Sequence, residues 1–188
     1  MTKDEINKAA MALRKAYETN VAISPLRDDY TLTMDSAYSI QDVNTQQWLN
    51  DGRILSGRKI GLTSKAVQEM IGVDQPDYGM LFSDMAYADG ETISLSHTLQ
   101  PRLEGEIAFF LGKDLDQPGI TMAEVISAVE YAVAAIEIID SRIADWNLDI
   151  MDSIADNASS GLYVLGSRPV KLDAFDHHNC EMSIEHNG

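Results

Sequence analysis

The sequence predicts an α+β fold in which a helical N-terminal region, residues 1–52, precedes a β-rich region, residues 53–188. Apolar residues between Ile6 and Trp48 recur every three or four positions, which is the period of an amphipathic helix. From Ile54 onward the spacing changes to short alternating runs between turns, which is the period of a strand. No repeat or low-complexity linker divides the chain, so we expect one structural unit.

Two helices are expected in the N-terminal region. Thr2 and Glu5 have the spacing of a capping box, and an amphipathic helix then covers about the first 18 residues. A turn around Pro25 ends this pattern. A second helix is predicted over residues 34–51, because apolar residues return at helical spacing and Gly52 follows as a stop signal.

Short apolar or alternating runs between turns predict the strands of the β-rich region. In chain order these runs are residues 54–63, 92–95, 103–111, 134–140, 162–165 and 180–184, and a turn-rich loop leads into a further short apolar segment at residues 80–82. Gly57 and Gly61 in the first run allow another backbone to approach closely. Two short helices are expected between strands, one over residues 64–71 and one that a second capping box, Thr121 with Glu124, begins.

The last residues carry a turn signal that nothing follows. Cys180, Met182 and Ile184 alternate as in a strand, and Asn187-Gly188 then has the character of a hairpin turn. We therefore expect either a chain whose C-terminal strands are missing or an arm that pairs with another subunit. Cys180 has no partner for a disulfide and is expected to be a buried, small apolar side chain.

The composition favours a protein that acts on a small molecule. Of the 188 residues 45% are hydrophobic, which is enough for the core of one domain. The net charge of −16 argues against nucleic acid or an anionic membrane as a partner. Because the sequence shows neither an N-terminal signal nor an apolar run of membrane-spanning length, we expect a cytoplasmic protein.

Acidic residues within apolar strands are the strongest chemical signal. Glu104 and Glu106 alternate in one strand, whose period of two places both carboxylates on the same face. Glu137 interrupts the apolar run 134–140, where an unpaired charge would be costly. Three carboxylates together suit a hard divalent cation such as Mg²⁺ or Mn²⁺ and not zinc. The alternative is a solvated sheet face, on which such Glu pairs are common.

A second possible metal signal is weaker. His177 and His178 are neighbours, but the sequence offers no third ligand at a suitable spacing. We expect both histidines on the surface.

Taken with the three acids, several segments resemble the 2-keto-4-pentenoate hydratase family of the fumarylacetoacetate hydrolase superfamily. The matching segments occur in order along almost the whole chain, at residues 22–27, 57–63, 72–79, 100–107, 137–142 and 154–160. The Pro-Leu-Arg segment and the Gln-Pro-Asp-Tyr-Gly segment favour the hydratase over its sister, 4-oxalocrotonate decarboxylase.

The resemblance implies a mixed β-roll, a Mg²⁺ or Mn²⁺ ion held by Glu104, Glu106 and Glu137, and a homo-oligomer. The implied substrate is a 2-oxo or 2-hydroxy dienoic acid, and the implied reaction adds water to 2-hydroxypenta-2,4-dienoate to give 4-hydroxy-2-oxopentanoate. This step belongs to the meta-cleavage degradation of aromatic compounds. Family members continue past the position of Gly188 with parts that help to close the fold.

The resemblance also draws attention to five polar residues. Lys59, next to two glycines, is the candidate for proton transfer or enolate stabilisation, and Asp77 for activating water or orienting the lysine. Asp156, Ser159 and Ser160 are candidates for hydrogen bonds to the substrate. The alternatives are a surface ammonium for the lysine and turn-stabilising roles for the other four.

Other functions stay open at this point. A 4-oxalocrotonate decarboxylase or an acylpyruvate-type hydrolase of the same superfamily would share the metal. A truncated, non-catalytic subunit would bind the metal or a full-length partner without turnover.

Overall fold

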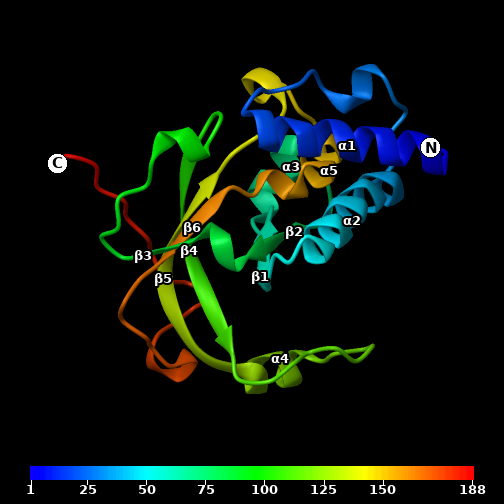
Figure 1. Cartoon of the computed structure of the whole chain (residues 1–188). Helices are drawn as coiled ribbons and strands as arrows, with labels where there is room; N and C mark the ends of the chain where they lie inside the picture. The colour runs from blue at the N-terminus through cyan, green and yellow to red at the C-terminus, as the bar shows by residue number, and fades with distance from the viewer. The chain divides into compact units, whose positions relative to one another are not determined.

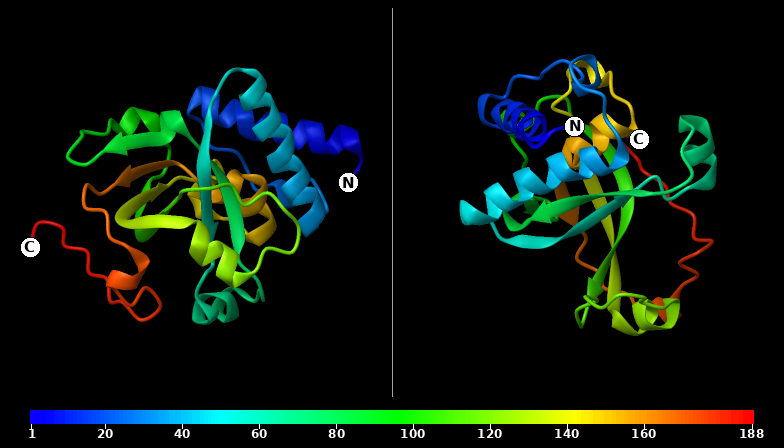
Figure 2. Two further views of the ribbon diagram at one scale, coloured as in Figure 1. Left: turned by 90° about the horizontal axis from the view of Figure 1, so that it is seen from below. Right: turned by 90° about the vertical axis from the view of Figure 1, so that its right-hand side faces the viewer.

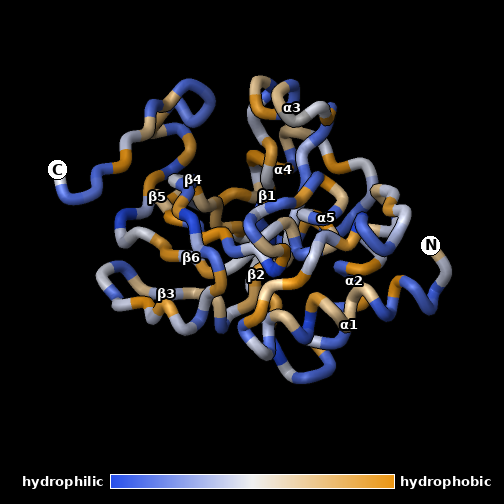
Figure 3. Tube along the Cα trace, turned by 90° about the horizontal axis from the view of Figure 1, so that it is seen from above, coloured by the Kyte–Doolittle hydropathy of each residue, from blue (hydrophilic) through white to orange (hydrophobic). Residues whose placement is uncertain are grey.

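Two long helices open the chain, as the apolar spacing predicts. In the computed structural model, which describes residues 1–188 apart from the side chain of Ile71, α1 spans Lys3–Thr19 and α2 spans Met34–Asn50. The predicted capping box begins α1: the Thr2 N–H donates to the Glu5 carboxylate over 2.7 Å, and the Thr2 hydroxyl accepts from the Glu5 N–H. Hydrophobic and hydrophilic stretches alternate along α1 (Figure 3), as expected for a helix with one buried face.

The chain divides into two compact units, each built from three separate stretches. The first unit is Met1–Ala86, Thr92–Arg102 and Ile138–Leu162, and the second is Tyr87–Glu91, Leu103–Glu137 and Tyr163–Gly188. The division into residues 1–52 and 53–188 stays a prediction. No helix in the described part of the chain is long and apolar enough to cross a membrane.

The core of the first unit lies where α1, α2 and α5 (Ile150–Ala155) pack together, side by side in Figure 1. Its completely buried side chains are small or aliphatic: Ala9, Ala10, Leu13, Ala37, Ile40, Ile143 and Ile154. Alanines on both long helices allow their axes to approach closely, and removing this apolar surface from water stabilises the unit by about 25 cal/mol for each Å².

A two-stranded antiparallel ribbon follows the helices in the first unit. β1 spans Leu55–Gly61 and β2 spans Asp77–Phe82, and α3, Lys65–Ile71, lies between them in the chain. The predictions of a strand and a short helix are confirmed. The short apolar segment at residues 80–82 is the second half of β2, which begins at Asp77 because this residue pairs with Gly61 in the ladder, so the end of the predicted loop is already strand.

A four-stranded sheet has the order β3-β6-β5-β4. Its strands are β3 (Ala86–Ala88), β4 (Arg102–Leu111), β5 (Val129–Ile139) and β6 (Leu162–Leu165). α4, Met122–Ala128, joins β4 to β5, and the predicted capping box of Thr121 and Glu124 begins it. Helices and sheets together confirm the α+β class.

Two strand predictions and one burial prediction are wrong. Residues 92–95 form a loop that ends in a 3₁₀ turn, Leu95–His97, in which the Ser94 hydroxyl accepts from the Ser96 N–H. Residues 180–184 take no regular secondary structure and form part of the extended C-terminal segment in Figure 2. Cys180 is exposed. Alternation of apolar residues makes a strand only when a neighbouring edge accepts its backbone hydrogen bonds.

The apolar residues of this segment have a different role in the second unit. A Cβ atom at residue 105 would meet Met182 Sδ and lie 3.0 Å from Ile184 Cδ1. Gly105 therefore lets both side chains pack directly on the backbone of β4.

Candidate functional site

The three predicted metal ligands come together in the second unit. Glu104 and Glu106 lie on β4 and Glu137 on the neighbouring strand β5, and one carboxylate oxygen from each lies within 4.8 Å of the others. Glu104 is exposed, whereas Glu137 is only 6% exposed. A strand's period of two and the pairing of β4 with β5 produce this cluster from residues that are far apart in the sequence.

The chemistry of this donor set fits a divalent cation. Carboxylate oxygens are the ligands that hard cations prefer, and a positive ion would offset the repulsion between negative charges held so close together. Gly105, which points to the other side of the strand, is covered by Met182 and Ile184, so the face that carries the glutamates stays separate from this apolar packing.

Lys59 and Asp77 are brought together on the ribbon of β1 and β2 in the first unit. Lys59 pairs with Gly79 and Gly61 pairs with Asp77 in the ladder. Cross-strand partners share a face and so do residues two apart, so all four lie on one face, with Lys59 and Asp77 as diagonal neighbours. The two glycines add no side chain of their own to this face.

Two glycines on this face are needed for close approach, but only one of them belongs to the pair that the sequence predicted. A Cβ atom at Gly61 would collide with Asp77 Oδ1, and one at Gly79 would collide with the Asn157 carbonyl and with Ser160 Oγ. Among the described side chains and backbone, nothing lies within 4 Å of such an atom at Gly57, so the predicted close approach is wrong at that position. Asp77 is 5% exposed and Lys59 is half-buried.

A left-handed turn supplies the partner of Lys59. Asn157, Ala158 and Ser159 have φ values of +57°, +51° and +52°, and the Lys59 ammonium donates to the Ala158 carbonyl over 3.0 Å. A residue other than glycine pays about 1–2 kcal/mol for this conformation. Strain of this kind persists only where surrounding contacts impose it, and it often marks functional sites.

Some of the contacts that impose the turn come from β2. The Asn157 side-chain oxygen accepts from the Met80 N–H over 2.7 Å, and its amide donates to the Met80 carbonyl over 2.9 Å. Together with the missing Cβ of Gly79, this pairing holds the turn against the ribbon.

The three residues predicted to bind substrate are buried in this neighbourhood and bonded to the protein. Asp156, Ser159 and Ser160 are 1%, 5% and 0% exposed. The Ser160 hydroxyl donates to the Asn157 carbonyl over 2.7 Å, and the hydroxyls of Ser159 and Ser153 lie 3.4 Å apart. Their role towards substrate stays a prediction.

Arg142 was not singled out from the sequence, although it is the largest of the completely buried side chains. Its Nε donates to Asp156 Oδ1 over 2.6 Å and its backbone N–H to Asp156 Oδ2 over 2.9 Å, and neither side chain is exposed. The guanidinium lies over the ring of Tyr17, 4.1 Å from its centre. The available signal was an arginine two residues after the apolar run 134–140, since a charge that is buried there needs an acidic partner.

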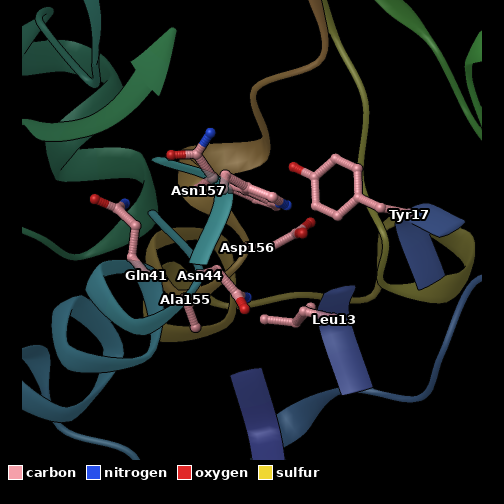
Figure 4. A pocket seen from close by; sticks show the side chains of 8 residues that line it. Leu13, Tyr17, Gln41, Asn44, Ala155, Asp156 and Asn157 are labelled. Atoms are coloured by element: carbon pink, nitrogen blue, oxygen red, sulfur yellow. The ribbon is translucent and has the colours of Figure 1, made fainter. Parts of the chain in front are cut away.

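Burial sets the electrostatics of this cluster. It raises the pKa of the Asp156 carboxyl to about 6, although the charge and hydrogen bonds of Arg142 act in the opposite direction. Burial opposes the charge of Arg142, but the attraction and hydrogen bond of Asp156, together with the charges of Tyr17 and Asp140, outweigh it, and the pKa of Arg142 is raised. Burial also raises the pKa of Tyr17, towards which the Asp156 carboxylate points in Figure 4.

The side chains around Asp156 and Tyr17 line a small pocket in the first unit (Figure 4). The lining residues are Leu13, Tyr17, Gln41, Asn44, Trp48, Ala155, Asp156 and Asn157. They fill it so closely that no space for a water molecule remains among them. Ligand sites in proteins enclose about 300–1,000 Å³, so this pocket is a feature of packing.

Comparison with known proteins finds close relatives, although no family model matches the chain. The chain is 54% identical over 184 residues to the TodF product hydratase of Pseudomonas putida, covering 97% of this chain and 69% of the relative. It is 53% identical over 178 residues to 2-keto-4-pentenoate hydratase 1 of Dechloromonas aromatica, and the match covers 94% of this chain and 68% of the relative. It is 44% identical over 190 residues to a 2-hydroxypent-2,4-dienoate hydratase of Pseudomonas putida, and the match covers 100% of this chain and 86% of the relative.

Solved structures with the same fold contain divalent metals. The 4-oxalocrotonate decarboxylase from Pseudomonas putida G7, complexed with magnesium and adipate, matches with a TM-score of 0.88 at 30% identity and covers 94% of this chain and 67% of its own. The same enzyme complexed with calcium and acetate matches with a TM-score of 0.86.

Proposed function

Because the chain belongs to the 2-keto-4-pentenoate hydratase family, we propose that it adds water to 2-hydroxypenta-2,4-dienoate and yields 4-hydroxy-2-oxopentanoate. The observation that carries the proposal is the identity of 54% over 184 residues with a hydratase. Relatives at 44–54% identity carry hydratase names, whereas the decarboxylase has the same fold at 30% identity. Hydration in the breakdown of aromatic compounds is therefore the function best supported.

Glu104, Glu106 and Glu137 are the proposed ligands of a Mg²⁺ or Mn²⁺ ion. When bound, such an ion supplies Lewis-acid polarisation of an oxygen at carbon 2 of the substrate, which favours the keto tautomer and stabilises enolate charge. The spacing of the three carboxylates supports this assignment, and the magnesium in the related decarboxylase agrees with it.

Lys59 is the proposed carrier of protons between the substrate's carbon atoms and the solvent. Hydration of the dienol adds the hydroxyl of water at carbon 4 and one hydrogen at each of carbons 3 and 5. One of these two protons comes from the 2-hydroxyl, which becomes the 2-oxo group, and the other comes from the water. The hydrogen bond from Lys59 to the Ala158 carbonyl fixes where the ammonium lies, and a positioned proton donor contributes about 10²–10⁴-fold to a rate.

Asp77 is the proposed group that orients Lys59 or accepts a proton from the attacking water. Its carboxylate shares a face of the ribbon with Lys59, and Gly61 leaves room for it. Asp77 is 5% exposed, so protein groups rather than bulk water surround its carboxylate.

An assay on the dienol tests this function. The conjugated substrate absorbs in the ultraviolet, so its hydration is followed as a loss of absorbance, with the product identified by NMR. We expect turnover that a chelator abolishes and that Mg²⁺ or Mn²⁺ restores. Carbon dioxide released from 4-oxalocrotonate at a higher kcat/KM would instead favour the decarboxylase, and no turnover of either compound with metal bound would favour a non-catalytic subunit.

Assembly into a homo-oligomer and a cytoplasmic location are further parts of the proposal. Native mass spectrometry gives the number of subunits, and fractionation of cells that produce the protein gives its location.

A further inference from the structure

The guanidinium of Arg142 joins the two ends of the left-handed turn. Its Nη2 donates to the Asp156 carbonyl over 2.7 Å, and its Nη1 donates to the Ser160 carbonyl over 2.9 Å. These carbonyls stand directly before and after the three residues with positive φ. One rigid, planar group therefore fixes the separation between the two ends of the turn.

Burial, an ion pair and a ring contact hold the guanidinium in place. Arg142 is completely buried, its Nε is bonded to the Asp156 carboxylate, and its flat face lies over the ring of Tyr17. The Tyr17 hydroxyl also lies 3.5 Å from the Ser160 carbonyl, which it can donate to. Helix α1 thus adds a second support to the same end of the turn.

We propose that Arg142 is a positioning residue for the reaction: by fixing both ends of the turn it fixes the Ala158 carbonyl, and through that carbonyl the ammonium of Lys59. This inference rests on the proposed function for its effect on turnover, but its structural part, the placement of Lys59, does not depend on which reaction the protein catalyses. Ion pairing with Asp156 alone would not require an arginine, because a lysine would supply the same charge.

Arg142→Lys separates these roles. A lysine keeps a positive charge near Asp156 but cannot donate to that carboxylate and to both carbonyls at once. In the full chain loaded with Mg²⁺ we expect kcat to fall about ten- to a hundredfold, the effect of a displacement of about 1 Å, with KM within twofold of the parent. Arg27→Lys is the matched control, because Arg27 also pairs with a buried carboxylate, that of Asp152, but its hydrogen bonds go to Asp152 and Asn147, which lie outside the turn.

A double-mutant cycle with Lys59→Met tests the route of the effect. If Arg142 acts through Lys59, Arg142→Lys should lower the residual turnover of the Lys59→Met variant by less than twofold. A loss in that background as large as in the parent would overturn the proposal, because Arg142 would then act on turnover without Lys59.

A spectroscopic measurement tests the placement without any turnover, and so distinguishes failure of this inference from failure of the hydratase assignment. In protein labelled at the ε-carbon of lysine, the signal that Lys59→Met removes should show two resolved ε-protons in the parent, since a fixed side chain keeps them in different surroundings. They should merge in Arg142→Lys and stay resolved in Arg27→Lys. If Arg142→Lys does not fold, the double variant Arg142→Met with Asp156→Asn removes both buried charges and is read in the same way. Resolved Lys59 protons in a folded variant that lacks the guanidinium would overturn the proposal.

Discussion

Gly61 lies opposite Asp77 in the ladder of β1 and β2, and the Asp77 carboxylate occupies the space that a Cβ atom at residue 61 would need. Gly61→Ala should therefore displace the carboxylate and lower kcat by about 10²-fold, since misplacement of a reacting group by about 1 Å has that effect. Steady-state kinetics measure the change. Gly57→Ala is the control on the same strand, because no atom in the described part of the structure lies within 4 Å of a Cβ atom there. Equal kinetics for the two variants would remove Asp77 from the proposed mechanism.

Glu137→Gln should weaken binding of Mg²⁺ or Mn²⁺ by at least about tenfold and leave most of the fold intact. The change removes one negative ligand and also relieves repulsion between the three carboxylates, so stability should change by less than about 1 kcal/mol. Isothermal titration calorimetry with each metal provides the measurement. Glu130→Gln, an exposed change on the same strand, should bind as the parent does. Parent-like affinity in Glu137→Gln and in Glu104→Gln would show that the three acids are not the metal site.

Lys59→Met should lower turnover by about 10²–10⁴-fold, the range for a group that transfers a proton, and keep metal affinity within about threefold. The matched control is Lys65→Met, which removes an ammonium bonded to the side chain of Gln68 in the same unit. Rates of Lys59→Met within threefold of the parent would assign Lys59 to the surface-lysine alternative.

Asp156 should make stability depend on pH between about 4 and 6. Burial raises the pKa of its carboxyl to about 6, so between the unfolded value of 3.8 and this one the folded protein holds a proton that the unfolded chain has lost. The contribution to stability is complete below the unfolded pKa and is lost as the pH rises through the folded pKa. The unfolding free energy of the parent minus that of Asp156→Asn should therefore fall by up to about 3 kcal/mol over this window. Urea unfolding at several pH values measures it, and a difference that rises with pH would contradict the sign.

Much of the fold follows from local signals in the sequence. Capping boxes at Thr2 and Thr121 and the change of apolar period after Trp48 locate the helices and most of the strands, because these signals act over a few residues. The prediction of a strand at residues 180–184 was wrong because a strand also needs a free sheet edge to pair with, and that edge depends on residues elsewhere in the chain. The three acids were predictable as a group. Apolar neighbours indicate the burial of Glu137, and the period of a strand places Glu104 and Glu106 on one face.

The surroundings of Lys59 could not be predicted in the same way. Asn157 is a residue that tolerates a positive φ, but Ala158 and Ser159 carry no signal for a left-handed turn, which exists because Met80, Gly79 and Arg142 impose it. The family resemblance identified Asp156, Ser159 and Ser160 as candidates. It did not predict that all three side chains are buried and hydrogen-bonded to other protein groups.

The positive φ of Ala158 has a consequence for attempts to raise the thermal stability of this protein. Glycine adopts such a conformation without penalty, so Ala158→Gly should relieve backbone strain, and a selection for heat resistance alone would tend to accept it. The same exchange would give extra freedom to the peptide whose carbonyl anchors Lys59. Thermal tolerance and catalytic rate are therefore expected to trade against each other at this one residue, and selection for the first would erode the second.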